Sequence, residues 1–157
     1  MRQLRRYKFL QICILLGLLN VSCGHFRIKT PGGRPPTTSE TMYVYGARGA
    51  ETYDHARELV DAVLKPGVFG HVAFRKWRDA DQRVTNAIRA LDETITAYKE
   101  GTETREDVQK ATDDMTKAVG EMIGVLSSLK GNDTIKASIH VAVILLFTVL
   151  DIVRPMK

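Results

Sequence analysis

The sequence predicts an all-α protein: an antiparallel helical bundle of three long helices plus one short helix, placed after a signal peptide and a flexible tether. Three observations lead to this prediction. Apolar residues recur at alternating steps of three and four through most of residues 52–157. Gly and Pro stand where these patterned stretches end. The connections between the stretches are short, which forces neighbouring helices to run antiparallel.

The first 22 residues have the layout of a secretory signal peptide. Basic residues come first, an apolar run follows over 9–21, and the small residue Ser22 stands before the expected cut. The basic residues are Arg2, Arg5, Arg6 and Lys8. We therefore expect residues 1–22 to direct export and to be removed.

With Cys23 at the cut, this segment resembles a bacterial lipoprotein signal. Val21 and Ser22 suit the two positions before the cysteine, whereas Asn20 stands where that family usually has Leu, Val or Ile. The resemblance implies that Cys23 carries a diacylglyceryl thioether and an N-acyl chain such as palmitate, and becomes the mature N-terminus. Gly24 in place of Asp then favours the outer membrane, facing the periplasm. Because of Asn20, an ordinary signal peptidase cut and an uncleaved anchor both stay open.

The positive charge of the chain lies in its N-terminal third. The whole sequence has a formal net charge of +5 and a pI near 9.3. Residues 1–22 carry four basic residues and no acidic ones, and residues 23–50 carry a net +3. From Glu51 onward, 15 basic residues face 17 acidic ones. The bundle therefore lacks the basic footprint of a nucleic-acid-binding protein, and no nucleic-acid partner is expected.

Residues 23–51 are predicted to be the lipidated cysteine and its flexible tether. Three of the five prolines fall within residues 30–39, where there is little to bury. Residues 41–45 alternate weakly, so they could form a short strand or dock on the bundle. Cys13 leaves with the signal peptide, so the mature chain has one thiol and no intramolecular disulfide.

The bundle domain is predicted over residues 52–157 and opens with a short helix over 53–65, which Pro66 ends. A long second helix follows over 72–100. Its apolar row contains one polar residue, Asp81.

The third helix begins near Thr104, which has capping-box spacing to Asp107, and ends at Lys130 and Gly131. Helices two and three each exceed 25 residues and form a long hairpin with matched apolar seams, as in a coiled coil.

The last helix is predicted over 135–153, capped by Asn132 or Asp133. From residue 137 to 150 it is apolar almost all round, which fits either the centre of a bundle or a membrane. Its clean run of 14 residues is short for a span of about 20 residues, so a core helix is favoured. The alternative is a small integral membrane protein whose C-terminal helix spans the bilayer.

No arrangement of residues for catalysis, a metal or a cofactor is evident, so we expect no enzyme, no metal site and no cofactor. Asp81 and His140 are the candidate polar residues of the helix seams. A buried carboxylate needs a partner, and His140, Arg78 and Lys136 are the candidates for pairing with Asp81. Such a pair would fix helix register rather than perform chemistry.

The expected function is that of a non-catalytic scaffold or protein-binding module in the bacterial cell envelope. The integral membrane protein, with a role in transport, lysis or assembly of a membrane complex, is the alternative. The expected partners are the membrane, through the lipid on Cys23, and another envelope protein. Association with a second copy of the chain stays open.

Overall fold

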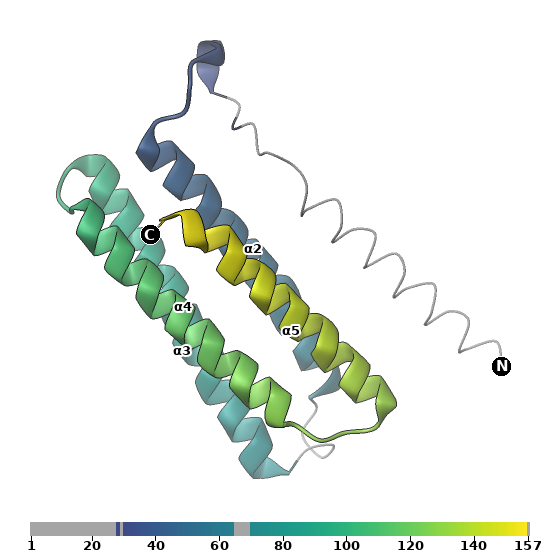
Figure 1. Ribbon diagram of the computed structural model, residues 1–157. Helices are drawn as coiled ribbons and strands as arrows, with labels where there is room; N and C mark the ends of the chain where they lie inside the picture. The colour runs from purple at the N-terminus through teal and green to yellow at the C-terminus, as the bar shows by residue number, and fades with distance from the viewer. Residues whose placement is uncertain (1–27, 29, 65–69, 157) are drawn as a thin grey trace. The chain divides into compact units, whose positions relative to one another are not determined.

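The computed structural model describes residues 28, 30–64 and 70–156. Four helices form an all-α antiparallel bundle, which confirms the predicted fold class (Figure 1). They are α2 (Thr38–Val63), α3 (His71–Glu100), α4 (Arg105–Ser128) and α5 (Asp133–Val153). A 3₁₀ turn, η2 (Arg154–Met156), ends the described chain. Another, η1 (Pro31–Gly33), belongs to the segment that precedes the compact unit starting at Pro36.

The bundle is built from two closely packed helix pairs. The most extensive contacts join α2 to α5 and α3 to α4, and thinner contacts join α2 to α3 and α4 to α5. In Figure 1, α5 accordingly lies along α2, and α4 lies along α3. Each helix thus has a neighbour on either side, and the apolar seams meet along the bundle axis.

The predicted tether is wrong from residue 38 onward, because α2 has 26 residues and begins at Thr38 rather than at Tyr53. A capping box starts it: the backbone N–H of Glu40 donates to Thr37 Oγ1 at 3.2 Å, and the N–H of Thr37 donates to Glu40 Oε2 at 2.8 Å. Residues 41–45 are helical, so the alternative of a short strand is also wrong. The bundle has four long helices instead of three long and one short.

Small residues let the first half of α2 pack closely. A Cβ on Gly49 would lie 3.1 Å from Val153 Cγ1 of α5, and a Cβ on Gly46 would lie 3.0 Å from Ile95 Cδ1 of α3. These approaches compensate for the poor intrinsic helix propensity of glycine. Tertiary packing therefore makes a helix of a stretch whose composition resembles a linker.

The hairpin of α3 and α4 follows the predicted boundaries. Gly101 adopts the left-handed conformation with φ 79° at the end of α3. Of all residues, glycine adopts this conformation most easily, because it has no Cβ. Thr104 and Asp107 form the predicted capping box, with 2.9 Å between Thr104 N and Asp107 Oδ2. The two helices bury most of their apolar seams. The buried members are Trp77, Val84, Leu91 and Ile95 of α3 and Val108, Met115, Val119, Met122 and Leu126 of α4.

Helix α5 begins with the predicted cap, in which the N–H of Ile135 donates to Asn132 Oδ1 at 3.1 Å. One side is buried in the bundle through Ile135, Ile139, Ala142, Leu146, Val149 and Val153. By length and composition, Asp133–Met156 is also apolar enough to cross a membrane, and 33% of the residues in its most apolar stretch are buried. The other side of this apolar helix therefore lies at the surface.

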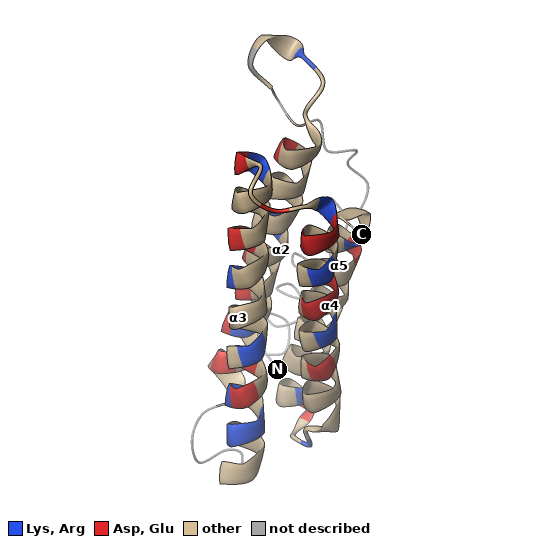
Figure 2. Cartoon of the chain, turned by 90° about the vertical axis from the view of Figure 1, so that its left-hand side faces the viewer, with Lys and Arg blue, Asp and Glu red and all other residues tan. Residues whose placement is uncertain are grey.

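Most charged residues of the bundle lie on α3 and α4. Figure 2 shows Lys and Arg interspersed with Asp and Glu along the exposed faces of α3 and α4. One such pair joins Arg83 of α3 to Glu121 of α4 at 3.5 Å. With its start moved to Thr38, the bundle segment carries 16 basic and 18 acidic residues, so its slight negative charge is unchanged.

Candidate functional site

The described part of the chain has one buried group of interacting polar side chains, located between α2 and α3. We call it the α2–α3 polar cluster: Tyr53, Arg57 and Asp61 from α2, and Trp77 and Asp81 from α3. Within each helix the members are spaced four apart, so they lie on one face and meet across the interface.

Asp81 is the centre of the cluster. The Tyr53 hydroxyl donates to Asp81 Oδ1 at 2.6 Å, and Arg57 Nε lies 3.1 Å from the same oxygen. Asp81 is 6% exposed and Tyr53 is 2% exposed. The carboxylate therefore keeps a hydrogen bond and an opposite charge in place of the water it lost, which is what a buried charge requires.

Asp61 extends the cluster towards the surface. The indole N–H of Trp77 donates to Asp61 Oδ1 at 3.2 Å, and Arg57 Nε lies 3.7 Å from Asp61 Oδ2. Trp77 is fully buried, so this hydrogen bond satisfies the one polar atom of the largest core side chain. Arg57 thus lies between two carboxylates, one buried and one exposed.

The environment of Tyr53 keeps its hydroxyl protonated. Burial raises the pKa of Tyr53 far above its usual value, and the hydrogen bond to Asp81 and the negative charge of Asp81 raise it further. The positive charge of Arg57 offsets only part of this increase in the pKa of Tyr53. Tyr53 therefore acts as a permanent hydrogen-bond donor rather than as a base.

The structure gives Asp81 other partners than the predicted ones. Arg78 is exposed on the outer side of α3, and Lys136 pairs with Asp133 of its own helix at 4.0 Å. His140 is exposed on the outer side of α5, so the prediction of a buried polar seam residue there is wrong. The sequence did contain the missed signal: Tyr53, Arg57 and Asp61 repeat every four residues along one helix face. The other predicted site residue, Cys23, lies outside the described residues.

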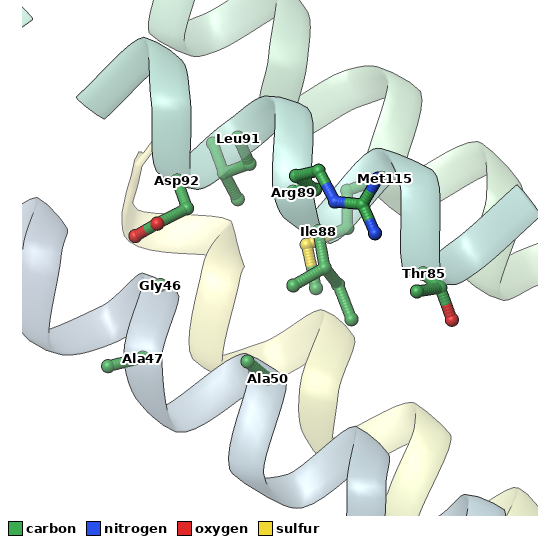
Figure 3. Close-up of a pocket in the computed structure, with 9 residues that line it drawn as sticks. All are labelled: Gly46, Ala47, Ala50, Thr85, Ile88, Arg89, Leu91, Asp92 and Met115. Carbon is green, nitrogen blue, oxygen red and sulfur yellow. The ribbon is translucent and has the colours of Figure 1, made fainter. Parts of the chain in front are cut away.

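A groove of about 360 Å³ lies next to the cluster on the same α2–α3 interface (Figure 3). Small residues of α2 form one side, and α3 forms the other, with Met115 of α4 at its base. The lining comprises Gly46, Ala47, Ala50, Thr85, Ile88, Arg89, Leu91, Asp92 and Met115. The α2 side of the groove carries only glycine and alanine, whereas the α3 side carries larger residues such as Ile88 and Arg89.

The side chains of the cluster contact one another, whereas those of the groove line an open space. The cluster is occupied by its own contacts, and Asp81 and Tyr53 are closed to substrate. The groove is mostly apolar, with the charges of Arg89 and Asp92 on α3 among its lining residues. Over the described ranges, no group of three or more His, Cys, Asp and Glu side chains could hold a metal ion.

No protein family model, curated protein sequence or solved structure matches this chain.

Proposed function

We propose that this protein is a bacterial envelope lipoprotein, anchored through acylated Cys23, in which the helical bundle acts as a non-catalytic scaffold or protein-binding module. The observation that carries the proposal is the order of segments in the chain. Basic residues, an apolar run and a small residue precede Cys23, and a self-contained bundle begins at Thr38. The 14 residues between them include three prolines and three glycines, a composition typical of linkers.

The bundle supports a binding role through its surface and its interior. Its apolar seams are buried, and in the α2–α3 polar cluster the carboxylate of Asp81 contacts Tyr53 and Arg57 of the same chain. The surface of the bundle is available for contacts with a partner. It carries mixed charges along α3 and α4 and an apolar outer side on α5. Gly24 after the cysteine supports placement in the outer membrane, facing the periplasm, which is part of the proposal.

Metabolic labelling with a palmitate analogue tests the anchor. Two acyl-bearing groups on one cysteine provide the several hydrocarbon chains that stable membrane anchoring needs. Wild type should take up label and sediment with membranes, whereas Cys23→Ala should lose the label. Cys13→Ala is the matched control, because it removes the other cysteine of the chain and should label as wild type does. Equal labelling of wild type and Cys23→Ala would refute the lipoprotein proposal.

The second candidate function is that of a small integral membrane protein spanning the bilayer with α5. Its specific support is the length and apolar composition of Asp133–Met156, a property that buried core helices also have. A reporter active only in the cytoplasm, fused after Lys157, separates the candidates. Activity of this reporter together with an acylated, exported Cys23 would require α5 to cross the membrane and would overturn the tethered module.

A further inference from the structure

Helix α5 carries a second seam on the side that faces away from the bundle. We call it the outer α5 seam: Ala137, His140, Ile144, Phe147, Asp151 and Arg154. Its members are three and four positions apart, as in the buried seam, and the centre of the outer seam lies about 150° around the helix from the centre of the buried one. All of its members except the half-buried Ala137 are exposed, including Phe147 at 53% and Ile144 at 37%.

The spacing of the residues in this seam is the same from its N-terminal end as from its C-terminal end. Ile144 lies four positions after His140, Phe147 lies three positions after Ile144, and Asp151 lies four positions after Phe147. If a second α5 runs antiparallel against the first, Ile144 therefore meets Phe147 of the other copy. In the next layer His140 meets Asp151, and in the last layer Ala137 meets Arg154.

The layers are chemically complementary. The two central ones join large apolar side chains, as the core positions of a coiled coil do. The flanking ones join an imidazole to a carboxylate, and the small Ala137 leaves room for the long Arg154. Val141, Val143, Thr148 and Leu150, which border the seam, carry no charge that would oppose this approach.

The same residues disfavour other occupants. A parallel pair would place His140 against His140 and Asp151 against Asp151. Among the lipid chains of a bilayer, the exposed side chains of His140 and Asp151 would lose their contact with water, which is costly for polar and charged groups, even though Asp151 pairs with Arg154 at 2.9 Å. Lys136 at the end of the seam likewise has Asp133 of its own helix as a neighbour. These ion pairs reduce repulsion between the ends of two facing helices.

We propose that this protein forms an antiparallel, two-fold symmetric dimer through the outer α5 seam, with a second copy of the chain as the occupant of this apolar face. In such an isologous interface each helix contributes the same surface to the other. The dimer uses α5 alone, so it goes beyond the proposed anchor function and does not depend on acylation of Cys23.

Photo-crosslinking of the full chain in cells tests the dimer. Phe147 is replaced by benzoylphenylalanine, which is close in shape and lies on an exposed position. Irradiation should give a product of twice the monomer mass, with the crosslink mapping near Ile144 of the second copy. Val72, an exposed apolar residue of α3 at 71%, is the matched control position and should give no such product. Absence of the doubled product at Phe147, or crosslinks only to lipid or to other proteins, would overturn the proposal.

A charge exchange then tests the pairing itself. His140→Asp places two carboxylates opposite each other in the proposed layer and should abolish the doubled product. Adding Asp151→His to this variant exchanges the two partners and should restore it. Circular dichroism of each variant checks that the bundle stays folded, which is expected because both positions are exposed. A folded His140→Asp variant that crosslinks like wild type would contradict the antiparallel dimer. The palmitate label, read on the same samples, reports separately on the anchor.

Discussion

Asp81 stands at a position of the α3 seam where its neighbours along the row are apolar. The contacts of Tyr53 and Arg57 explain how a charge survives there, since both come from α2 and reach the same carboxylate oxygen. Buried ion pairs seldom add net stability over apolar residues, but they make helix register specific. The cluster joins α2 to α3 through side-chain contacts, and we expect apolar burial to provide most of the folding free energy.

Removing the carboxylate should destabilise the bundle. In Asp81→Ala the buried Tyr53 hydroxyl loses its carboxylate acceptor at 2.6 Å and keeps only the main-chain carbonyl of residue 81 at 3.3 Å, and Arg57 loses one of its two carboxylate neighbours. Because Arg57 can still reach solvent, we expect a loss of about 1–3 kcal/mol in the free energy of unfolding, the usual range for an unsatisfied buried group. Denaturant titration measures it. Asp114→Ala, at an exposed position of α4, is the control and should cost less than about 0.5 kcal/mol. Equal effects would show that Asp81 is not paired as described.

Tyr53 should make stability fall at alkaline pH. Its pKa is raised in the folded protein by burial and by Asp81, whereas in the unfolded chain a tyrosine titrates near about 10. The folded state thus holds the phenol proton more tightly. This contribution is complete below about pH 10 and is lost as the pH rises above it. Urea titrations across this range should show a smaller decline for Tyr53→Phe than for wild type, and parallel curves would contradict the assignment.

At the scale of elements, the sequence predicted the type and ends of α3, α4 and α5 well, because each has a sustained apolar period and a recognisable cap. It missed the first half of α2. Gly46 and Gly49 weaken both intrinsic helix propensity and the apolar period, and the nearby prolines suggested a tether. The capping box of Thr37 and Glu40 was the local signal for the true start. The helical state of this part of α2 also depends on its close packing against α5. Such packing cannot be predicted from the sequence of one segment.

The pairing of Asp81 was predicted only in kind. A polar residue in an apolar row indicates that it has a partner. The sequence alone does not say whether α2 or α5 is the helix that faces Asp81 on α3. The candidates on α5, His140 and Lys136, have other surroundings for this reason. Which helices are neighbours is a property of the assembled bundle.

Gly49 tests the close packing of α2 against α5. In Gly49→Leu the side chain meets Val153 and Met115, so overpacking should lower the free energy of unfolding by about 1–3 kcal/mol. Gly120→Leu is the matched control on α4, since a Cβ there meets nothing within 4 Å. Better helix propensity should make this control neutral or up to about 1 kcal/mol more stable. Thermal or denaturant unfolding compares the two, and equal losses would contradict the contact at Gly49.

For the whole molecule, the true start of the bundle predicts where the chain can be shortened. A fragment beginning at Pro36 keeps the capping box and all of α2, so it should fold with the helicity and unfolding midpoint of the longer chain. A fragment beginning at Thr52 loses the buried Met42 and Gly49 and uncovers part of α5. Its midpoint should fall sharply or its cooperative transition should vanish, as circular dichroism will show. Equal midpoints would restore residues 38–51 to the role of a tether.

In the proposed function, the bundle is carried on a lipidated cysteine, Cys23, at the start of the mature chain. The most direct test is the intact mass of the protein purified from the membranes of a bacterial host that exports it. We predict a chain that begins at Cys23, with residues 1–22 absent and the added mass of a diacylglyceryl group and an N-acyl chain on that residue. A mass equal to the full unmodified chain, or to a cleaved chain without acyl groups, would contradict the account.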